Sequence, residues 1–386
     1  AAIQVDENTQ RLTIGHHVFA EGDALSFDGL TGEVKVGRVA SKPSEILVVV
    51  AGHLAAEDSE IYQRFSRVMK WADRVRRLGV RANADQPDQA EIAYAFGARG
   101  IGLCRTEHMF FDPERIIHMR EMILAENEEQ RRRALDRLLP FQRQDFIELF
   151  NIMNGLPITI RLLDPPLNEF LPLTQEDMTE VAEAAGMTME EVRIRKVELD
   201  ESNPMLGHRG CRLGITYSEI YEMQARAIFE AQAEVSKNGT PINPEIMIPL
   251  VSAKREVEIV KTRVDAVAAA VRNERGRDFD YRLGVMVETP RAALRAEEIA
   301  GHTDFLSFGT NDLTQMTYGL SRDDAGRFMS AYVQQGVFPE DPFHVLDQDG
   351  VGELLKLGAE RGRSSKPGIT LSICGEHGGN PESIAF

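Results

Sequence analysis

Three arginines each stand at or near the end of a short apolar run that could be a buried strand. They are Arg105 in GIGLCRTEH, Arg161 in TIRLLDPP and Arg209 in GHRG. An arginine at a buried strand end is costly unless it is paired, so each could simply pair with an acid such as Glu107 or Asp164. Three arginines on one face would instead form a clamp for phosphate or carboxylate, because guanidinium matches such oxygens bidentately. Both interpretations stay open at this point.

Two acidic residues occupy similar positions. Glu288 follows an apolar run in GVMVETP, and Asp312 lies just past a glycine in SFGTNDLTQ. Carboxylates from adjacent strand ends suit a hard divalent cation that keeps open positions for a ligand. Glu288 could alternatively be a helix N-cap partner, since Pro290 fits a helix start, or could pair with one of the arginines. The backbone N–H groups of residues 309–312 could also receive carboxylate or phosphate oxygens.

Cys374 lies in the glycine-rich stretch ICGEHGG. The simple interpretation is a tight turn with an incidental cysteine, but glycines also let the backbone come close to a ligand. With the arginines and the acidic pair, the thiol would belong to a site for a small, doubly anionic molecule. A metal beside an α-keto acid would stabilise an enolate, and Cys374 could supply or remove the proton on carbon. His377 is an alternative proton carrier.

These residues need a scaffold that brings strand ends together. From about Ile61 onward, apolar runs alternate with amphipathic segments whose apolar residues recur at three- and four-residue spacing. The predicted strands lie in VRANAD, GIGLCRTE, ITIRLLDPP, EIMIPLV, LGVMVETP, FLSFGTND and ITLSICGEHGG. Such alternation indicates an α/β fold with a parallel sheet, and seven or eight units predict a (β/α)8 barrel of the TIM type. Reactive residues of such barrels gather at the C-terminal strand ends.

Several segments fall outside this repeat. We expect a β-rich region over residues 1–40, because short β-prone runs alternate there with turns, then a linker over 41–60 and the barrel over 61–386. The run ILVVV at 46–50 could still be a strand. The insert from Leu173 to Asp200 is expected to be helical, and NPMLGHRGCRL to be a loop. On this count the last βα unit of the barrel is missing.

Composition limits the classes of partner. The net charge of −17 argues against binding to nucleic acid or to an anionic membrane, because both need a basic face. The three cysteines lie far apart without CxxC spacing, which excludes a disulfide framework or zinc ribbon and indicates a reducing compartment, so we expect the cytoplasm. No run approaches the roughly 18–20 apolar residues of a membrane span. The start shows no secretory signal and no initiator Met, so we expect a piece of a longer protein.

Several long strings in the sequence resemble the pyruvate, phosphate dikinase family of phosphoenolpyruvate (PEP)-utilising enzymes, over nearly the whole chain. They are GIGLCRTEHMFF, TIRLLDPPLNEFLP, NPMLGHRGCRLG, PEIMIPLV, GVMVETPRAAL, SFGTNDLTQMTYGLSRDDAGRF and ICGEHGGNP. The resemblance implies a C-terminal barrel that binds PEP or pyruvate with Mg²⁺ and dimerises with a second copy. The family is a phosphotransferase that converts ATP, pyruvate and phosphate into AMP, PEP and diphosphate through a phosphohistidine.

The resemblance also implies roles for the residues that match these motifs. Arg105 and Arg161 would bind substrate, Arg209 would assist at the phosphoryl group, and Cys374 would donate the proton to the enolate. Glu288 and Asp312 would hold Mg²⁺. The further substrate contacts would come from Glu288, Gly309, Thr310, Asn311 and Asp312.

The sequence also departs from the family. This sequence contains no Gly-Gly-Met-Thr-Ser-His-like phosphohistidine motif, and neither His16 nor His17 lies in one. We also expect the family's nucleotide-binding domain to lie outside this chain. The first forty residues resemble the tail of the swivelling phosphohistidine domain, so we expect the chain to work with that domain of a full-length enzyme. The alternatives are a PEP synthase-type kinase, the first enzyme of the sugar phosphotransferase system, a metal-enolate lyase and an inert ligand-binding fragment. MTYGLSRDDAGRF and CGEHGG favour the dikinase, and a lyase would not need three phosphate-clamping arginines.

Overall fold

The computed structural model describes residues 3–6, 9–29, 31–172, 174–239 and 242–386. The chain forms two compact units, Ala1–Arg77 and Leu78–Phe386. The predicted domain limits at residues 40 and 60 remain predictions. No helix in the described ranges is long and apolar enough to cross a membrane.

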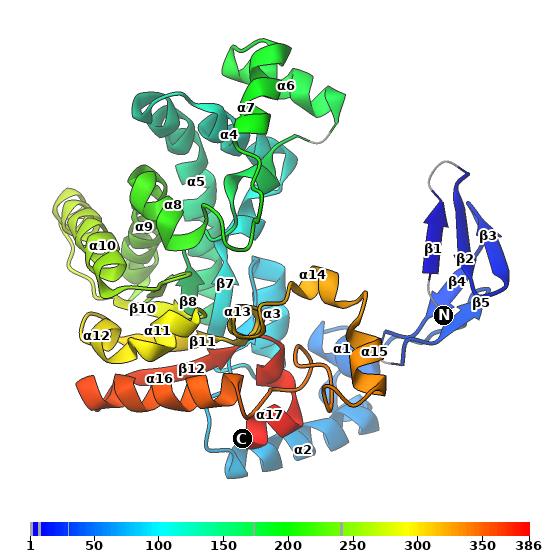
Figure 1. The fold of residues 1–386 in the computed structure, drawn as a ribbon. Coiled ribbons are helices and arrows are strands. Elements are labelled where there is room, and N and C mark those ends of the chain that lie inside the picture. The colour runs from blue at the N-terminus through cyan, green and yellow to red at the C-terminus, as the bar shows by residue number, and fades with distance from the viewer. Residues whose placement is uncertain (1–2, 7–8, 30, 173, 240–241) are drawn as a thin grey trace. The chain divides into compact units, whose positions relative to one another are not determined.

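The first unit is rich in strands, as its alternating β-prone runs predict. Its strands are β1 (Ile3–Asp6), β2 (Arg11–Ile14), β3 (His17–Ala20), β4 (Leu25–Phe27) and β5 (Val34–Val36). β1, β2 and β3 form an antiparallel sheet, and β4 pairs with β5 in an antiparallel hairpin (Figure 1). Helices α1 (Glu45–Val50), η1 (Ala56–Asp58) and α2 (Glu60–Val75) follow.

The run ILVVV is helical rather than a strand, because it lies within α1. The side chain of Glu45, in the first turn of α1, accepts a hydrogen bond from the hydroxyl of Ser59 at 2.8 Å. Ser59 in turn is the N-cap of α2 and accepts from the backbone N–H of Tyr62. This contact between two helix starts is a tertiary feature that the apolar run alone does not show.

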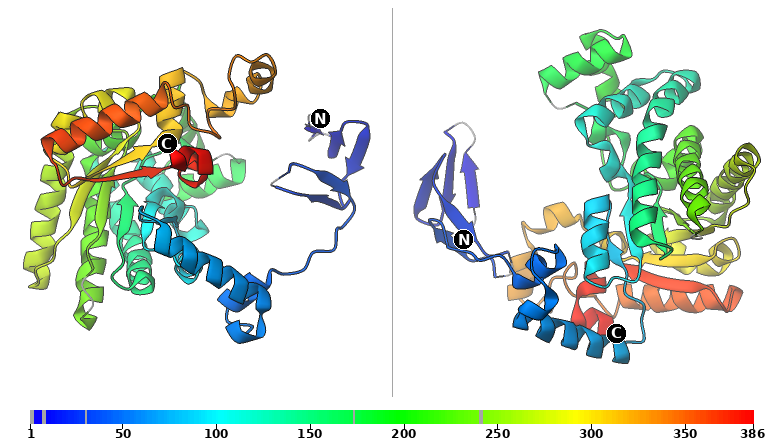
Figure 2. Two further views of the ribbon diagram at one scale, coloured as in Figure 1. Left: turned by 90° about the horizontal axis from the view of Figure 1, so that it is seen from below. Right: turned by 180° about the vertical axis from the view of Figure 1, so that it is seen from behind.

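The second unit is built on a parallel sheet of seven strands in the order of the chain. The strands are β6 (Ala82–Asn83), β7 (Ile101–Arg105), β8 (Ile158–Arg161), β9 (Glu245–Ile248), β10 (Arg282–Val287), β11 (Phe305–Gly309) and β12 (Thr370–Cys374). Each strand pairs in parallel with the next, and the sheet curls into a half-barrel with helices on its outer side (Figure 2). This order is typical of a TIM-type barrel, so the predicted fold class and all seven predicted strands are confirmed.

Helices connect these strands and follow the last of them. They are α3 (Pro87–Ala95), η2 (Thr106–Phe110), α4 (Pro113–Leu124), α5 (Glu128–Met153), η3 (Leu167–Phe170), α8 (Gly210–Thr216), α9 (Ser218–Val235), η4 (Ser236–Asn238), α10 (Lys254–Arg275), α11 (Pro290–Leu294), α12 (Ala296–Ala300), α13 (Thr310–Tyr318), α14 (Arg322–Ala325), α15 (Met329–Gln334), α16 (Val351–Ser365), η5 (Glu376–Gly379) and α17 (Pro381–Ala385). The main apolar core lies between these helices and the sheet.

Two further segments follow the sequence-based expectations closely. The insert holds α6 (Gln175–Ala185) and α7 (Met189–Glu198), and only its first residue, Leu173, lies outside the described residues. The segment NPMLGHRGCRL is a loop up to Arg209, but its last residues differ from the prediction because they begin α8.

A second, smaller apolar cluster fills the inside of the half-barrel. It consists of Leu103, Met247, Met286 and Phe305, with Cys374 packed against it. Side chains alternate along a strand, so inward positions recur at every second residue. The inward set therefore continues from these apolar residues to the polar residues at the C-terminal strand ends.

Candidate functional site

The register of the sheet places Arg105 and Arg161 side by side. They are the last residues of β7 and β8, and their Cα atoms are partners across the two strands. Both side chains therefore reach the same end of the half-barrel, the C-terminal end predicted from the sequence.

Arg161 is buried and ion-paired on two sides. Its Nη2 atom donates to Glu107 Oε1, and its Nη1 atom lies 2.9 Å from Asp164 Oδ2. Burial disfavours the charge of Asp164, but the charges of Arg161 and Arg209 outweigh burial and lower the pKa of this carboxyl. Glu107 Oε2 and Arg161 Nε are buried without a hydrogen-bond partner in the described part of the chain. The site thus contains polar atoms that a ligand could satisfy.

Arg209 joins the same cluster from the loop before α8. Its Nη2 atom donates to Asp164 Oδ2 at 2.5 Å, and its Nη1 atom lies 3.7 Å from Asp312 Oδ1. Gly210 follows at φ +57, where a Cβ atom would lie 2.6 Å from the Cβ atom of Leu250. A glycine is therefore required for this loop to bring Arg209 against the strand ends. Arg161 and Arg209 are thus paired with acids, and they also lie together in one cluster, so the two interpretations do not exclude each other.

Glu288 is buried directly beyond β10. Its Oε1 atom accepts the backbone N–H of Leu250 at 2.6 Å, which supports Leu250 in a left-handed conformation at φ 56. Its Oε2 atom has no hydrogen-bond partner among the described residues. A Cβ atom on Gly309 would lie 2.9 Å from this oxygen, so Gly309 leaves room for it. Thr289, and not Glu288, caps α11 by accepting from the N–H of Ala292.

The environment of Glu288 bears on the predicted metal. Burial, followed by the charges of Asp312 and Asp164, raises the pKa of Glu288 well above its usual range. No group of three or more His, Cys, Asp or Glu side chains among the described residues is placed to hold a metal ion. Glu288 and Asp312 form only a pair, which fits a hard divalent cation that takes its other ligands from water and substrate. The unpartnered oxygen of Glu288 is consistent with that use.

The N-terminus of α13 meets the end of β12. The hydroxyl of Thr310 donates to the carbonyl of Cys374 at 2.9 Å, and Asn311 Oδ1 accepts the N–H of Glu376 at 3.3 Å. Gly375 has φ +99, and a Cβ atom there would lie 2.7 Å from Thr310 Oγ1. The side chains of Thr310 and Asn311 therefore hold the cysteine segment, while the backbone N–H groups at the start of α13 are those that a helix leaves without partners.

Cys374 is partly exposed at the top of the inner apolar cluster. Its thiol accepts from the hydroxyl of Ser307 at 3.7 Å and donates to the carbonyl of Phe308 at 3.5 Å. Burial raises the pKa of Cys374 to about 11, although the hydrogen bond from Ser307 opposes the shift. The charges that act on this thiol include those of Glu288, Asp312 and Arg161, so the cysteine lies in the same cluster.

His377, the alternative proton carrier, is fully buried in η5. Its Nε2 atom lies 3.0 Å from the carbonyl oxygen of Pro342, which makes Nε2 the protonated nitrogen. Burial lowers the pKa of His377, so the ring favours its neutral form. This contact joins η5 to the loop that contains Pro342, and it engages the Nε2 proton there.

Three buried polar residues that the sequence analysis did not single out also belong to the site, and the first two are Asp85 and Ser307. Asp85 follows β6 and forms an ion pair with Arg105, with Oδ2 2.9 Å from Nη2. Ser307 lies in β11 and contacts Cys374. Asp85 ends the strand-like run VRANAD just as Glu288 ends another, so the same criterion would have found it. Ser307 shows only as a polar residue in an apolar run.

A third such residue, Gln224, lies in the middle of α9. Its Oε1 atom accepts the backbone N–H of Leu163, and its Nε2 atom donates to the hydroxyl of Thr106, both at 2.8 Å. It thereby joins the segments that follow β8 and β7. No local pattern in the sequence indicates this role, because glutamine is an ordinary helix residue.

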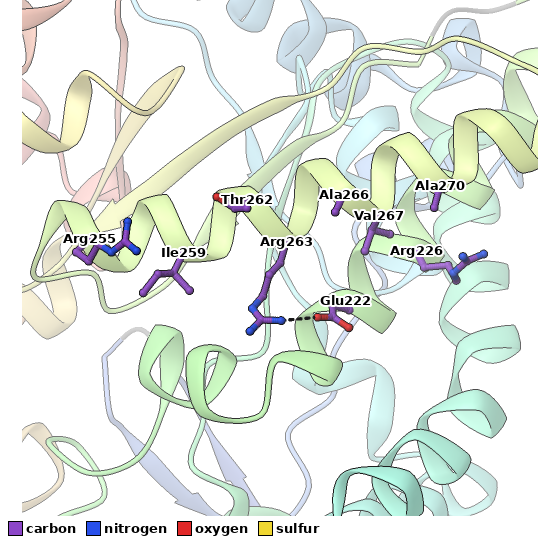
Figure 3. Close-up of a pocket in the computed structure, with 9 residues that line it drawn as sticks. All are labelled: Glu222, Arg226, Arg255, Ile259, Thr262, Arg263, Ala266, Val267 and Ala270. Carbon is purple, nitrogen blue, oxygen red and sulfur yellow. Dashed lines mark hydrogen bonds and ion pairs between the residues drawn. The ribbon is translucent and has the colours of Figure 1, made fainter.

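A cavity of about 580 Å³ lies elsewhere, on the outer layer between α9 and α10 (Figure 3). Its arginines are already engaged by acids. Arg263 donates to Glu222 at 2.9 Å, as Figure 3 shows, and Arg226 donates to Glu274 at 2.7 Å. The cavity therefore offers little for an anion, and the strand-end cluster remains the candidate site.

This fold and cluster agree with the comparison against known families. The model of the family described as "PEP-utilising enzyme, PEP-binding domain" matches residues 59–386. The chain belongs to this family of PEP-utilising enzymes.

Its relatives narrow the similarity further. The chain is 52% identical over 386 residues to pyruvate, phosphate dikinase of Rhizobium meliloti (strain 1021), and covers 41% of that protein. It is 48% identical over 385 residues to pyruvate, phosphate dikinase of Clostridium symbiosum, and covers 42% of it. It is 51% identical over 389 residues to the chloroplastic enzyme of Flaveria pringlei, and covers 39% of it. All of the chain is matched in each case, so it spans about two-fifths of the length of these relatives.

Proposed function

We propose that this chain supplies the PEP- and pyruvate-binding site of a pyruvate, phosphate dikinase. The whole enzyme would convert ATP, pyruvate and phosphate into AMP, PEP and diphosphate. At this site pyruvate would receive a phosphoryl group from a phosphohistidine on another domain. The observation that carries the proposal is the grouping of Arg161, Arg209, Asp312 and Cys374 around the buried carboxylate of Glu288. Relatives that match the whole chain support it by their names.

The arginines would bind the anionic groups of the substrate. Arg105 and Arg161 are neighbours in register, and Arg209 is joined to Arg161 through Asp164. Their fixed planar forks suit carboxylate and phosphate oxygens. In the proposed arrangement Arg105 and Arg161 bind substrate and Arg209 assists at the phosphoryl group. Backbone N–H groups at the start of α13, from Gly309 to Asp312, would donate hydrogen bonds to further substrate oxygens.

Glu288 and Asp312 would hold Mg²⁺. When bound there, the cation would polarise the substrate carbonyl as a Lewis acid. The chain's own contribution is the placement of the two carboxylates, with Glu288 fixed by the N–H of Leu250 and Asp312 held near Arg209. The acids of the cluster outnumber its three arginines, so a divalent cation would also balance their charge. These acids include Asp85, Glu107, Asp164, Glu288 and Asp312.

Cys374 would donate a proton to the methylene carbon of the enolate when pyruvate forms, and remove it in the reverse direction. The thiol is protonated at neutral pH because burial raises its pKa to about 11. Ser307 would stabilise the thiolate left after proton donation, because its hydroxyl already donates to the sulfur.

The wider assignments belong to the same proposal. They are a phosphohistidine domain as the partner in phosphoryl transfer, a homodimer, a cytoplasmic enzyme, and domains at 1–40, 41–60 and 61–386. The names of the relatives favour the dikinase over a PEP synthase-type kinase or a metal-enolate lyase. If the isolated chain binds its ligand but has no catalytic activity, the remaining alternative is an inert ligand-binding fragment.

The proposal is tested by exchange of the methyl protons of pyruvate, followed by NMR in D₂O with Mg²⁺. We expect exchange above the enzyme-free rate that requires both Mg²⁺ and Cys374. The Cys374→Ala variant should lose it, whereas Ser372→Ala, an exposed neighbour on the same strand, should keep it. A folded native chain that binds pyruvate without catalysing exchange would contradict catalytic competence and leave a ligand-binding role.

A further inference from the structure

We propose that Asp85 is a positioning residue, which fixes the guanidinium of Arg105 so that one edge of it is presented to an anionic substrate. The inference rests on the proposed function and extends it to a residue outside the motifs above. Asp85 lies just past β6 and is only 2% exposed. Its Oδ1 atom accepts the backbone N–H of Arg105 at 2.7 Å, and its Oδ2 atom lies 3.1 Å from Nε and 2.9 Å from Nη2.

The contact uses one particular edge of the guanidinium. Asp85 occupies the side formed by Nε and Nη2, while Nη1 makes no hydrogen bond within the described residues. The terminal edge, formed by Nη1 and Nη2, is therefore left for a carboxylate or phosphate, which it can bind with two parallel hydrogen bonds.

Arg105 differs in this respect from the two other arginines. Arg161 uses Nη1 and Nη2 for Asp164 and Glu107, and Arg209 uses the same pair of atoms for Asp312 and Asp164. The side chain of Arg105 is 37% exposed, against 10% and 11% for the others. Arg105 is thus the arginine of this group whose terminal edge is open, and its direction depends on Asp85.

The carboxylate of Asp85 is itself held in place. His108 Nδ1, from η2, lies 2.7 Å from Asp85 Oδ2, and it must carry the proton because a carboxylate only accepts. The backbone N–H of Asp85 donates to Gln89 Oε1 at 2.9 Å. The carboxylate therefore has contacts on several sides and cannot rotate freely. This matters because a group that orients another side chain must itself be held in place.

A purely structural role would also explain some of these contacts, because the bond to the N–H of Arg105 joins β6 to β7. The variant Asp85→Asn separates the two roles. Its amide oxygen can still accept that N–H, but its NH₂ group would face the Nε and Nη2 donors of Arg105. Gln89→Ala is the matched control, since it removes a hydrogen bond from the same turn without touching Arg105.

The experiment measures the dissociation constant of PEP with Mg²⁺ by titration calorimetry on the whole chain, with thermal unfolding in parallel. We expect Asp85→Asn to weaken binding about tenfold, a typical size for coupling between contacting residues, and Gln89→Ala to leave it unchanged. In an Arg105→Met background, Asp85→Asn should have no further effect on binding. If the role of Asp85 were purely structural, Asp85→Asn would weaken PEP binding in the Arg105→Met variant as well.

Either an unchanged affinity in Asp85→Asn or a full additional loss in the Arg105→Met background overturns the positioning role. These outcomes are distinct from failure of the proposed function. A folded native chain that binds no PEP with Mg²⁺ would refute the proposed site and the inference together, whereas tight native binding that ignores Asp85 refutes the inference alone.

Discussion

The hydroxyl of Ser307 donates to the thiol of Cys374 from the neighbouring strand, with Oγ and Sγ 3.7 Å apart. The thiol in turn donates to the carbonyl of Phe308 at 3.5 Å. The pair joins β11 to β12 at the point where the inner apolar cluster gives way to the charged cluster. A protonated thiol with a hydroxyl ready to stabilise its thiolate has the properties of a general acid.

Replacing Ser307 with alanine should slow the exchange of pyruvate methyl protons by about ten- to a hundredfold, because a hydrogen bond to a charged group contributes about 1.5–3 kcal/mol. The dissociation constant of pyruvate should change little, since Ser307 contacts the thiol. NMR exchange rates at saturating pyruvate measure the effect. An unchanged rate would contradict a role for Ser307 in stabilising the thiolate, and Ser372→Ala is again the control on the same sheet.

Alkylation of Cys374 by iodoacetamide should depend on pH with a midpoint near the pKa of about 11. Only the thiolate reacts, and the raised pKa keeps it scarce, so the rate should rise about tenfold per pH unit below the midpoint. Mg²⁺ should lower the midpoint, because a nearby cation favours the thiolate. Short labelling pulses followed by mass spectrometry measure this. The buried Cys104 and Cys211 serve as unlabelled controls, and a midpoint of about 8.5, the pKa of free cysteine, would contradict the prediction.

Replacing Glu288 with glutamine should leave the melting temperature of the metal-free chain nearly unchanged. Burial disfavours the charged form of Glu288 and raises its pKa, so an uncharged glutamine of similar shape should be tolerated in the metal-free chain. Its oxygen can still accept the N–H of Leu250. The stabilisation by Mg²⁺, however, should disappear.

Thermal unfolding with EDTA and with Mg²⁺ tests this prediction. The native chain should also release protons when it binds Mg²⁺ below the raised pKa of Glu288, because a metal ligand must be deprotonated. Calorimetry in buffers with different ionisation enthalpies detects that release. Equal stabilisation of both chains by Mg²⁺ would remove Glu288 from the metal site.

Replacing Asp164 with alanine should lower the free energy of unfolding by about 3–5 kcal/mol, because Arg161 and Arg209 would lose a shared buried partner. Urea unfolding measures the change. Glu129→Ala is the matched control, since it removes an exposed partner of Arg133 and should cost no more than about 1 kcal/mol.

The same contact predicts a dependence on pH. The charges of Arg161 and Arg209 lower the pKa of Asp164 despite its burial. Its contribution to stability is therefore present above the usual aspartate pKa of about 3.9, and is lost as the pH falls through the lower folded value. The difference in stability between the native chain and Asp164→Ala should narrow over that acidic range. A difference that stays constant would contradict the ion pairs.

The sequence by itself determined the alternation of strands and helices and the residues at the strand ends. Buried parallel strands appear as continuous apolar runs, so all seven could be located, and the polar residues that follow them had to meet at one end of the sheet. Arg105, Arg161 and Glu288 were found in this way. Asp85 follows a predicted strand as well and meets the same criterion.

Only the tertiary structure decided which of these groups contact one another. Arg161 and Arg209 share Asp164, while Arg105 pairs with Asp85, and no spacing in the sequence distinguishes these choices. The reason is physical, since such partners are set by strand register and by the close approach of segments far apart in the chain. The helix α1, formed by a run of β-branched residues, depends in the same way on a contact with α2 that local pattern does not contain.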